Sequence, residues 1–152
     1  MVDALLSYIG CTKGLHTWFH AAHHVTKGAS FAGDHVNLYG EIYNGISEDF
    51  DKLVEKSIMV AHSEEVACPM MITEVASKVL TQYDSPVGRG PDAIAAIGLE
   101  YMRNHIANLT ELYRMLESCG ALSLGMDDYL ASAANQYEGY VYLLTQRVKK
   151  GI

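Results

Sequence analysis

The chain has 152 residues, of which 49% are hydrophobic, and a formal net charge of -7 at pH 7. This length suits one domain with a proper core and is too short for two, so we expect a single domain over residues 1–152. The acidic balance argues against a surface that coats nucleic acid, because phosphate binding needs Lys and Arg to replace counterions. Three widely spaced cysteines, Cys11, Cys68 and Cys119, indicate neither a disulfide framework nor a zinc knuckle.

The N-terminal segment lacks a basic leader and a long apolar run. His16 and His20 interrupt it before a membrane span could be completed. We therefore expect no membrane association and a cytoplasmic protein. The basic residues at the end of the chain, Arg147, Lys149 and Lys150, are those expected to oppose the dipole of a terminal helix.

The first half of the sequence has the pattern of two long helices. Apolar residues at steps of three and four predict a helix over about 2–27, which stops at Gly28, a residue suited to a left-handed cap. A second helix is predicted over about 31–60, with Ser30 available as its N-cap. Its apolar stripe consists of Ile42, Ile46, Phe50, Leu53 and Ser57. The short connection makes the two helices antiparallel neighbours.

The second half begins with a segment that prolines and glycines break repeatedly. Residues 61–91 contain one periodic piece, which predicts a crossover that carries a short helix over about 70–82. Pro91 opens a third long helix, which runs to Gly120. Asp127 and Asp128 open a fourth, which ends near residues 149–151.

No segment alternates as a strand would, so the chain is predicted to be all-α. Two helices, a long crossover and two more helices describe a ferritin-like four-helix bundle in which the third helix runs parallel to the second. A disordered insertion between the two halves would produce the same sequence pattern.

Five of the seven histidines lie within twenty residues, and this concentration points to metal. They are His16, His20, His23, His24 and His35. Asp51 and Glu55, four residues apart on the second helix, can reach one metal from one face. Carboxylates with imidazoles favour iron or manganese, and the lack of nearby cysteine lowers the odds of structural zinc. A solvated acidic face and hydrogen-bonded histidines would give the same pattern without metal.

Residues 23–31, His-His-Val-Thr-Lys-Gly-Ala-Ser-Phe, followed by His35, resemble the HWNxKGxxF…H segment of the Dps family of mini-ferritins. In that family an Asp-x-x-x-Glu pair follows on the second helix, as Asp51 and Glu55 do here. Residues 69–82 and 128–144 resemble the short crossover helix and the fourth helix of the family. Some phage-encoded ferritin-like proteins share such a histidine-rich start, which fits a divergent, phage-type member.

The resemblance implies a dodecameric shell whose iron sites lie between two-fold related chains. His23 and His35 of one chain and Asp51 and Glu55 of the other would be the metal ligands. It also implies a ferroxidase reaction, in which ferrous iron is oxidised by peroxide or oxygen and stored as ferric mineral, limiting oxidative damage. Iron is the metal implied, with manganese or zinc as alternatives.

The chain departs from the family pattern at the proposed site. Tyr39 stands where the family has an acidic residue, four after the second histidine. His35 and Asp51 are sixteen residues apart, one more than in the family, which leaves them about 160° apart on an ideal helix. The two side chains can lie on the same face of the helix only if a π-bulge intervenes; otherwise they belong to different sites. The apolar stripe places Asp51 and Glu55 outward, towards a partner subunit, and His35 nearer the bundle interior.

Two other readings remain open. Tyr39 and the extra residue favour a ferritin-like oligomer that has lost the metal site and serves as a structural or partner-binding protein. A second metal hypothesis brings His20, His35, His105 and Glu138, one from each long helix, together inside the bundle. It ranks lower because the chain has no Glu-x-x-His motif. The basic N-terminal tail with which many Dps proteins bind DNA is missing, so we expect no DNA binding.

Overall fold

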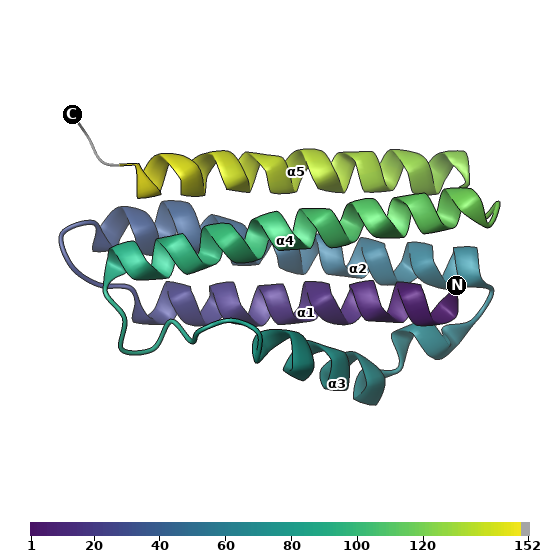
Figure 1. The fold of residues 1–152 in the computed structure, drawn as a ribbon, viewed down its shortest axis with the longest axis horizontal. Helices are drawn as coiled ribbons and strands as arrows, with labels where there is room; N and C mark the ends of the chain where they lie inside the picture. The colour runs from purple at the N-terminus through teal and green to yellow at the C-terminus, as the bar shows by residue number, and fades with distance from the viewer. Residues whose placement is uncertain (150–152) are drawn as a thin grey trace.

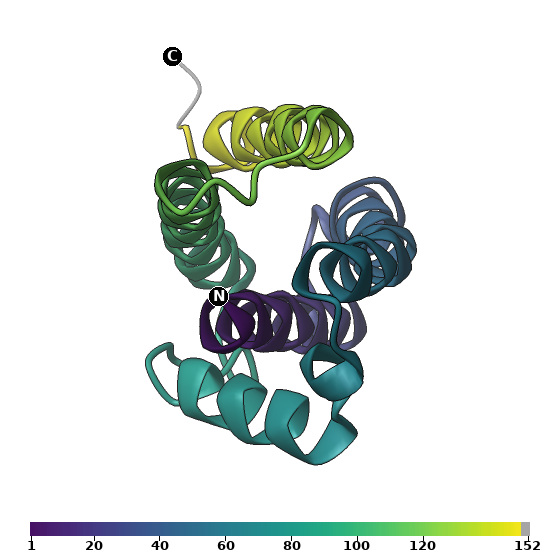
Figure 2. The ribbon, with the colours of Figure 1, turned by 90° about the vertical axis from the view of Figure 1, so that its right-hand side faces the viewer.

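Four long helices form a bundle in the computed structural model, which describes residues 1–149 (Figure 1). They are α1 (Val2–Val25), α2 (Glu41–Ala61), α4 (Pro91–Ser118) and α5 (Leu124–Val148). Viewed end-on, they occupy the four corners around a common core (Figure 2). The chain returns along the length of the bundle between α2 and α4, so these two helices run in the same direction. The predicted all-α bundle with a long crossover is confirmed.

The crossover contains a short 3-10 turn, η2 (Glu64–Ala67), and the helix α3 (Pro69–Leu80), which packs on the outer side of α1 (Figures 1 and 2). Two glycines of α1 permit this close approach. A Cβ added at Gly10 would lie 2.4 Å from the Cβ of Val75, and one at Gly14 would lie 3.2 Å from the carbonyl oxygen of Ala76. With α3 on one side and the bundle on the other, α1 is covered around most of its circumference.

The ends of the helices follow local capping chemistry. The helix α5 begins at Leu124, three residues before the predicted start, because the Ser123 hydroxyl accepts a hydrogen bond of 3.1 Å from the Met126 N–H. The helix ends at Val148, with Lys149 as its C-cap, whereas residues 150 and 151 of the predicted end at 149–151 lie outside the described residues. Among residues 1–149, no helix combines the length and the apolar character that crossing a membrane demands.

The predicted second helix changes its winding along its length. Its first part, η1 (Gly33–Gly40), is a π-helix that continues directly into α2. A π-helical turn absorbs an additional residue relative to an α-helix. The sixteen steps between His35 and Asp51 then correspond to about fifteen α-helical ones, which reduces the angle between the two side chains from about 160° to about 60°. The π-helix therefore absorbs the extra residue, and it is the kind of bulge that His35 and Asp51 need in order to lie on the same face of the helix.

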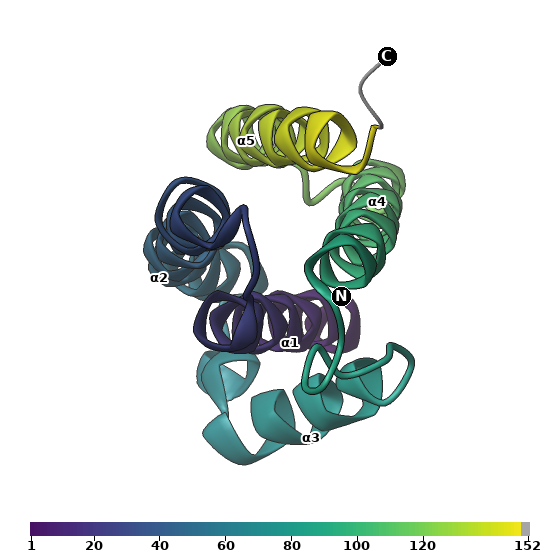
Figure 3. The same ribbon diagram turned by 90° about the vertical axis from the view of Figure 1, so that its left-hand side faces the viewer.

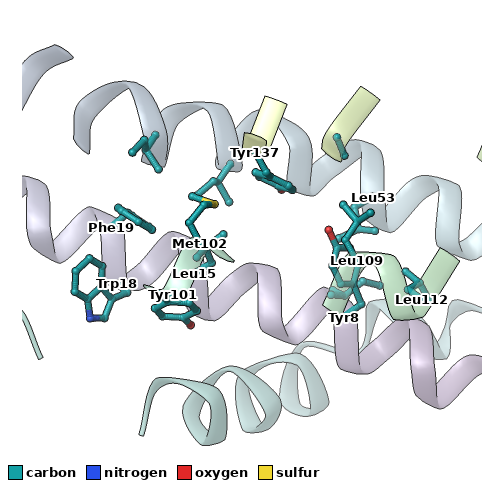
Figure 4. Packing of buried hydrophobic residues seen from close by; sticks show 14 of the residues in the cluster. Tyr8, Leu15, Trp18, Phe19, Leu53, Tyr101, Met102, Leu109, Leu112 and Tyr137 are labelled. Carbon is teal, nitrogen blue, oxygen red and sulfur yellow. The ribbon is translucent and has the colours of Figure 1, made fainter. Parts of the chain in front are cut away.

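The interior of the bundle is rich in aromatic side chains (Figure 4). Tyr8, Trp18 and Phe19 enter it from α1, and Tyr137 enters it from α5. Four members of the predicted stripe of α2 are buried, and the fifth, Phe50, is half-buried. The stripe therefore identifies the core face of α2.

Two polar groups lie in this interior: His105, which the second metal hypothesis expected inside the bundle, and Asp49, which the sequence did not single out as buried. Asp49 is buried and accepts hydrogen bonds from the hydroxyls of Tyr129, at 2.7 Å, and Tyr137. His105 is buried between Tyr8, whose ring centroid is 5.1 Å away, and Tyr137, whose ring is nearly perpendicular to it at 5.0 Å. Neither ring nitrogen of His105 has a hydrogen-bond partner among the described residues, and burial lowers its pKa to about 3. This imidazole is therefore neutral at physiological pH.

Candidate metal centre

His23 and His35 form a stacked pair at one end of the bundle. The turn after α1 folds η1 back beside the end of α1 (Figure 3), so that the two rings lie 3.9 Å apart between centroids, with 13° between their planes. The Nδ1 atom of His23 lies 2.5 Å from the backbone oxygen of His35, and the Nδ1 atom of His35 lies 2.7 Å from the backbone oxygen of His23. Both side chains are half-buried.

These two reciprocal hydrogen bonds determine which nitrogen of each ring is engaged and which is free. A carbonyl oxygen only accepts hydrogen bonds, so each Nδ1 must carry the proton and donate it. In the neutral imidazole the Nε2 atom of each ring then has the lone pair, which is the form in which imidazole binds a metal ion. A backbone carbonyl on the other nitrogen is also the usual way in which proteins orient metal-binding histidines. His23 and His35 can therefore provide two oriented nitrogen ligands.

A partly buried ion pair lies at the start of η1, next to His35. The carboxylate of Asp34 is buried and accepts hydrogen bonds of 2.9 and 3.1 Å from Nε of Arg147, which reaches it from the end of α5. The Ser30 hydroxyl donates to Asp34 at 2.8 Å and accepts from Arg147 at 3.0 Å. The hydrogen bonds to Asp34 raise the pKa of Arg147. Ser30 and Arg147 thus belong to a tertiary contact, whereas the sequence suggested a local helix cap and a dipole contact.

Asp51 and Glu55 lie one turn apart on the exposed face of α2, as the apolar stripe predicts. Sixteen residues at about 1.5 Å each separate His35 from Asp51 by roughly 24 Å along the helix. Ligand atoms must lie within about 2 Å of a bound transition metal ion, so one ion cannot contact both pairs of one chain. Within residues 1–149, no three His, Cys, Asp or Glu side chains gather in an arrangement that could hold a metal ion.

The residue that faces the histidine pair is Gly40. A Cβ added at Gly40 would lie 3.5 Å from Nδ1 of His23 and 2.9 Å from the backbone oxygen of His35. Tyr39 instead is fully buried, with its ring centroid 6.2 Å from that of Phe19. The π-helix shifts the register so that a glycine, and no carboxylate, occupies the position next to the pair. The one-residue insertion was the sequence signal for this shift.

A surface hollow of about 510 Å³ lies beside the pair. His23 and Gly40 form part of its wall, together with the carboxylate-bearing residues Glu41 and Glu48 and, from α5, Gln136 and Tyr140. Sequence reasoning did not single out Glu41 or Glu48 as candidate ligands. The wall of the hollow gives the surroundings of the pair an acidic character that attracts cations.

The position of His35 corrects one expectation. The apolar stripe, phased as a continuous α-helix, placed His35 nearer the bundle interior, whereas the residue is half-buried beside His23 and its ring stacks on exposed Phe31 at 4.9 Å. The π-helix changes the angular position of His35 relative to the apolar stripe of α2, and the expectation depended on that position. The second metal hypothesis is wrong for the described residues, because Glu138 is exposed and His105 is enclosed by aromatic rings.

Comparisons with known proteins identify the fold. The sequence matches no family model and no curated protein. Among solved structures, the chain is similar to a Dps protein from Vibrio cholerae O1, described as a member of a broad superfamily of ferritin-like diiron-carboxylate proteins. The TM-score is 0.79 at 14% identity, over 97% of this chain and 88% of the other.

The Dps protein of Mycobacterium smegmatis is similar with a TM-score of 0.75 at 16% identity, over 98% of this chain and 86% of the other. At such low identity the likeness establishes the fold, and the ligands have to be argued from this chain's own residues. The resemblance that residues 23–55 predicted is thus confirmed in the architecture: this chain has the ferritin-like fold of the Dps proteins.

Proposed function

We propose that this chain is a Dps-like mini-ferritin that binds ferrous iron between two of its copies, oxidises it and stores it as ferric mineral. The observation that carries the proposal is the division of the ligands into two pairs. His23 and His35 offer two oriented nitrogens, and Asp51 and Glu55 offer two exposed carboxylates roughly 24 Å away along the helix. Each pair supplies only two of the ligands of a metal site, and a nitrogen pair from one chain would be completed by a carboxylate pair from another.

A two-fold dimer would bring the pairs together. In an isologous interface, residue i of one copy meets residue j of the other, and j meets i. Residue 43 lies midway between His35 and Asp51, so a two-fold axis that crosses α2 near Tyr43 would bring His35 of one copy opposite Asp51 of the other. The π-helix supports this arrangement, because it leaves both side chains within about 60° of each other around the helix axis.

The combined ligand set suits iron as the substrate. Two imidazoles and two carboxylates form a mixed nitrogen and oxygen environment that binds Fe²⁺, with Mn²⁺ and Zn²⁺ as competitors. The carboxylates of Asp51 and Glu55 add negative charge, which stabilises the ferric product more than the ferrous substrate. Each ferrous ion would give one electron to peroxide or oxygen, and the ferric ion would pass into the mineral.

A second candidate function is a ferritin-like assembly without ferroxidase activity, which serves a structural or partner-binding role. Gly40 favours it, because this residue has no side chain with which to complete a metal site beside His23 and His35. We rank it second, because the reciprocal hydrogen bonds of the histidine pair are a specific arrangement that a purely structural role does not require.

We further propose that the protein forms a dodecameric shell, is cytoplasmic, consists of a single domain over the whole chain and does not bind DNA. The acidic net charge of -7 supports the last of these. Light scattering on the purified protein would give the mass of the assembly, and a gel shift at low salt would detect any complex with DNA.

Iron oxidation tests the function directly. Apo-protein mixed with ferrous iron and peroxide should develop ferric absorbance faster than buffer does. The variants H23Q/H35Q and D51N/E55Q should each lower this rate by about 10-fold or more, because each removes one pair of ligands. H62Q, which changes an exposed histidine at the far end of α2, should leave the rate unchanged. If both double variants react as fast as the wild type, the ferroxidase assignment fails and the structural alternative takes its place.

A further inference from the structure

Three other histidines form a row along α1 that the proposed iron site does not use. His16, His20 and His24 follow one another at single-turn spacing, with ring centroids 5.6 Å apart for the first two and 4.4 Å apart for the last two. None of these three rings makes a hydrogen bond within residues 1–149, whereas His23 and His35 each use one nitrogen in this way. Their nitrogens therefore remain available to a ligand.

The surroundings of the row hold the imidazoles in place and leave them accessible. The ring of Tyr43 stacks on that of His20 at 4.4 Å, with 28° between the planes, and this contact limits the freedom of a half-buried side chain. His24 is exposed in the single chain, so that an ion can reach it there from solvent. Residues four apart on a helix project from one face, which allows their side chains to bind the same ion.

We infer that His20 and His24 form a separate metal site on α1, for a borderline divalent cation such as Cu²⁺ or Zn²⁺. Metal–nitrogen bonds are about 2.0–2.1 Å long, and a centroid separation of 4.4 Å lets two rings converge on one ion after small side-chain rotations. Water completes the coordination, and His16, one turn before His20, is not required.

The ligand chemistry distinguishes this site from the proposed iron site. A set of imidazoles without carboxylates favours copper and zinc over the harder ferrous and manganous ions, and copper binds most tightly. The row is also adjacent to the iron site, because the rings of His23 and His24 lie 5.4 Å apart. Under the proposed function, a cation on His20 and His24 would repel ferrous iron at His23 and slow its uptake.

Copper binding to the H23Q/H35Q variant tests this inference, because this background removes the stacked pair but keeps the row. Titration with Cu²⁺ alone should show one tight site per chain, and the electron paramagnetic resonance spectrum should show coupling to more than one nitrogen. Adding H20Q and H24Q should weaken the binding by about 10-fold or more, because chelation by two linked ligands is lost. Adding H62Q in their place is the matched control and should change nothing.

Two further measurements keep the result interpretable. H24Q alone changes an exposed residue, so it should weaken copper binding while the circular dichroism spectrum stays that of the parent. A parallel titration with Zn²⁺ should show the same dependence on His20 and His24, with weaker binding throughout.

Unchanged copper affinity in the H20Q/H24Q variants, or loss of all copper binding in H23Q/H35Q, would overturn the inference. The iron proposal can fail separately. A wild-type protein that binds copper through His20 and His24 but does not oxidise ferrous iron would refute the proposed function alone.

Discussion

His105 lies in the core with the ring of Tyr8 stacked on it and the ring of Tyr137 nearly perpendicular to it. Burial lowers its pKa from the ordinary value of 6.5 to about 3 in the folded chain. Between these two values the unfolded chain binds a proton that the folded chain does not. The stability that depends on neutral His105 is therefore fully present above pH 6.5 and is lost as the pH falls towards 3.

This difference predicts a measurable pH dependence. Below pH 6.5, His105 should lower the free energy of unfolding by up to about 1.4 kcal/mol per pH unit. Urea denaturation at pH 7, 6 and 5 would give the free energy of unfolding of the wild type and of H105L as a function of pH. The difference between the two slopes measures the contribution of His105, because the effect of the carboxylates is common to both proteins. H62Q, a change at an exposed position, should keep the wild-type slope. Equal slopes for wild type and H105L would contradict the prediction.

Asp49 and its two tyrosines provide a second prediction. Tyr137→Phe removes one of the two hydrogen bonds to the buried carboxylate, and hydrogen bonds to charged groups contribute about 1.5–3 kcal/mol. We expect the free energy of unfolding to fall by about 2 kcal/mol, measured by the urea midpoint. Tyr142→Phe, at an exposed position of the same helix, is the control and should have little effect. A Tyr137→Phe variant as stable as this control would show that the contact contributes nothing.

The sequence predicted whether some of the acidic side chains of α2 are exposed or buried, but not all of them. The outward position of Asp51 and Glu55 followed from the apolar stripe of the helix on which they lie. The burial of Asp49 did not, because its partners are 80 and 88 residues away and belong to another helix. A local pattern carries information about the face of a helix, but not about which hydroxyl groups a distant helix presents to it.

The π-helix η1 connects a residue insertion to the phase of the whole second helix. If it absorbs one extra residue, deleting Asn37, which is exposed within η1, should convert the segment into an α-helix without rotating α2. We expect the melting temperature of this variant to stay within a few degrees of the wild type. Deleting Lys52, also exposed but within α2, should instead rotate every later side chain by about 100° and turn its apolar residues away from the core.

Thermal unfolding followed by circular dichroism would compare the two deletions. A Lys52 deletion as well tolerated as the Asn37 deletion would contradict the role assigned to η1. Equally large losses of stability for both would mean that the π-helix is required for packing and does not merely absorb a residue.

Helix positions were predicted closely where capping residues mark them and less closely where they do not. Pro91 marks the start of α4 correctly, whereas the acidic residues at 127 and 128 suggested a later start for α5 than Ser123 produces. The sequence also revealed the extra residue between His35 and Asp51. It did not specify where that residue is absorbed, because this depends on how His23 and η1 pack against each other.

At the scale of the assembly, the proposed iron site requires ligands from two chains, and a subunit-mixing experiment tests this requirement. H23Q/H35Q lacks the nitrogen ligands and D51N/E55Q lacks the carboxylates, so that each variant alone should keep at most about a tenth of the wild-type rate. In a mixed dimer, one of the two symmetry-related sites combines the intact histidines of one copy with the intact carboxylates of the other.

Random mixing makes half of the dimers mixed, and each of these has one intact site, so about a quarter of the wild-type ferroxidase activity should return. The two variants would be unfolded together, refolded together and assayed with ferrous iron and peroxide. Variants that are refolded separately and combined afterwards are the control and should keep that low rate. No recovery in a sample whose mixed dimers are demonstrated by mass spectrometry would exclude a site shared in this way.

The packing of α3 on α1 has a consequence for how the protein is made. The ribosome produces α1 before α2, α3 and α4, which cover its sides, and α4 is complete only at residue 118. Apolar surface of α1 therefore stays uncovered until α4 has been synthesised. Nascent chains that stall before α4 should be prone to aggregation and should need protection by chaperones during translation.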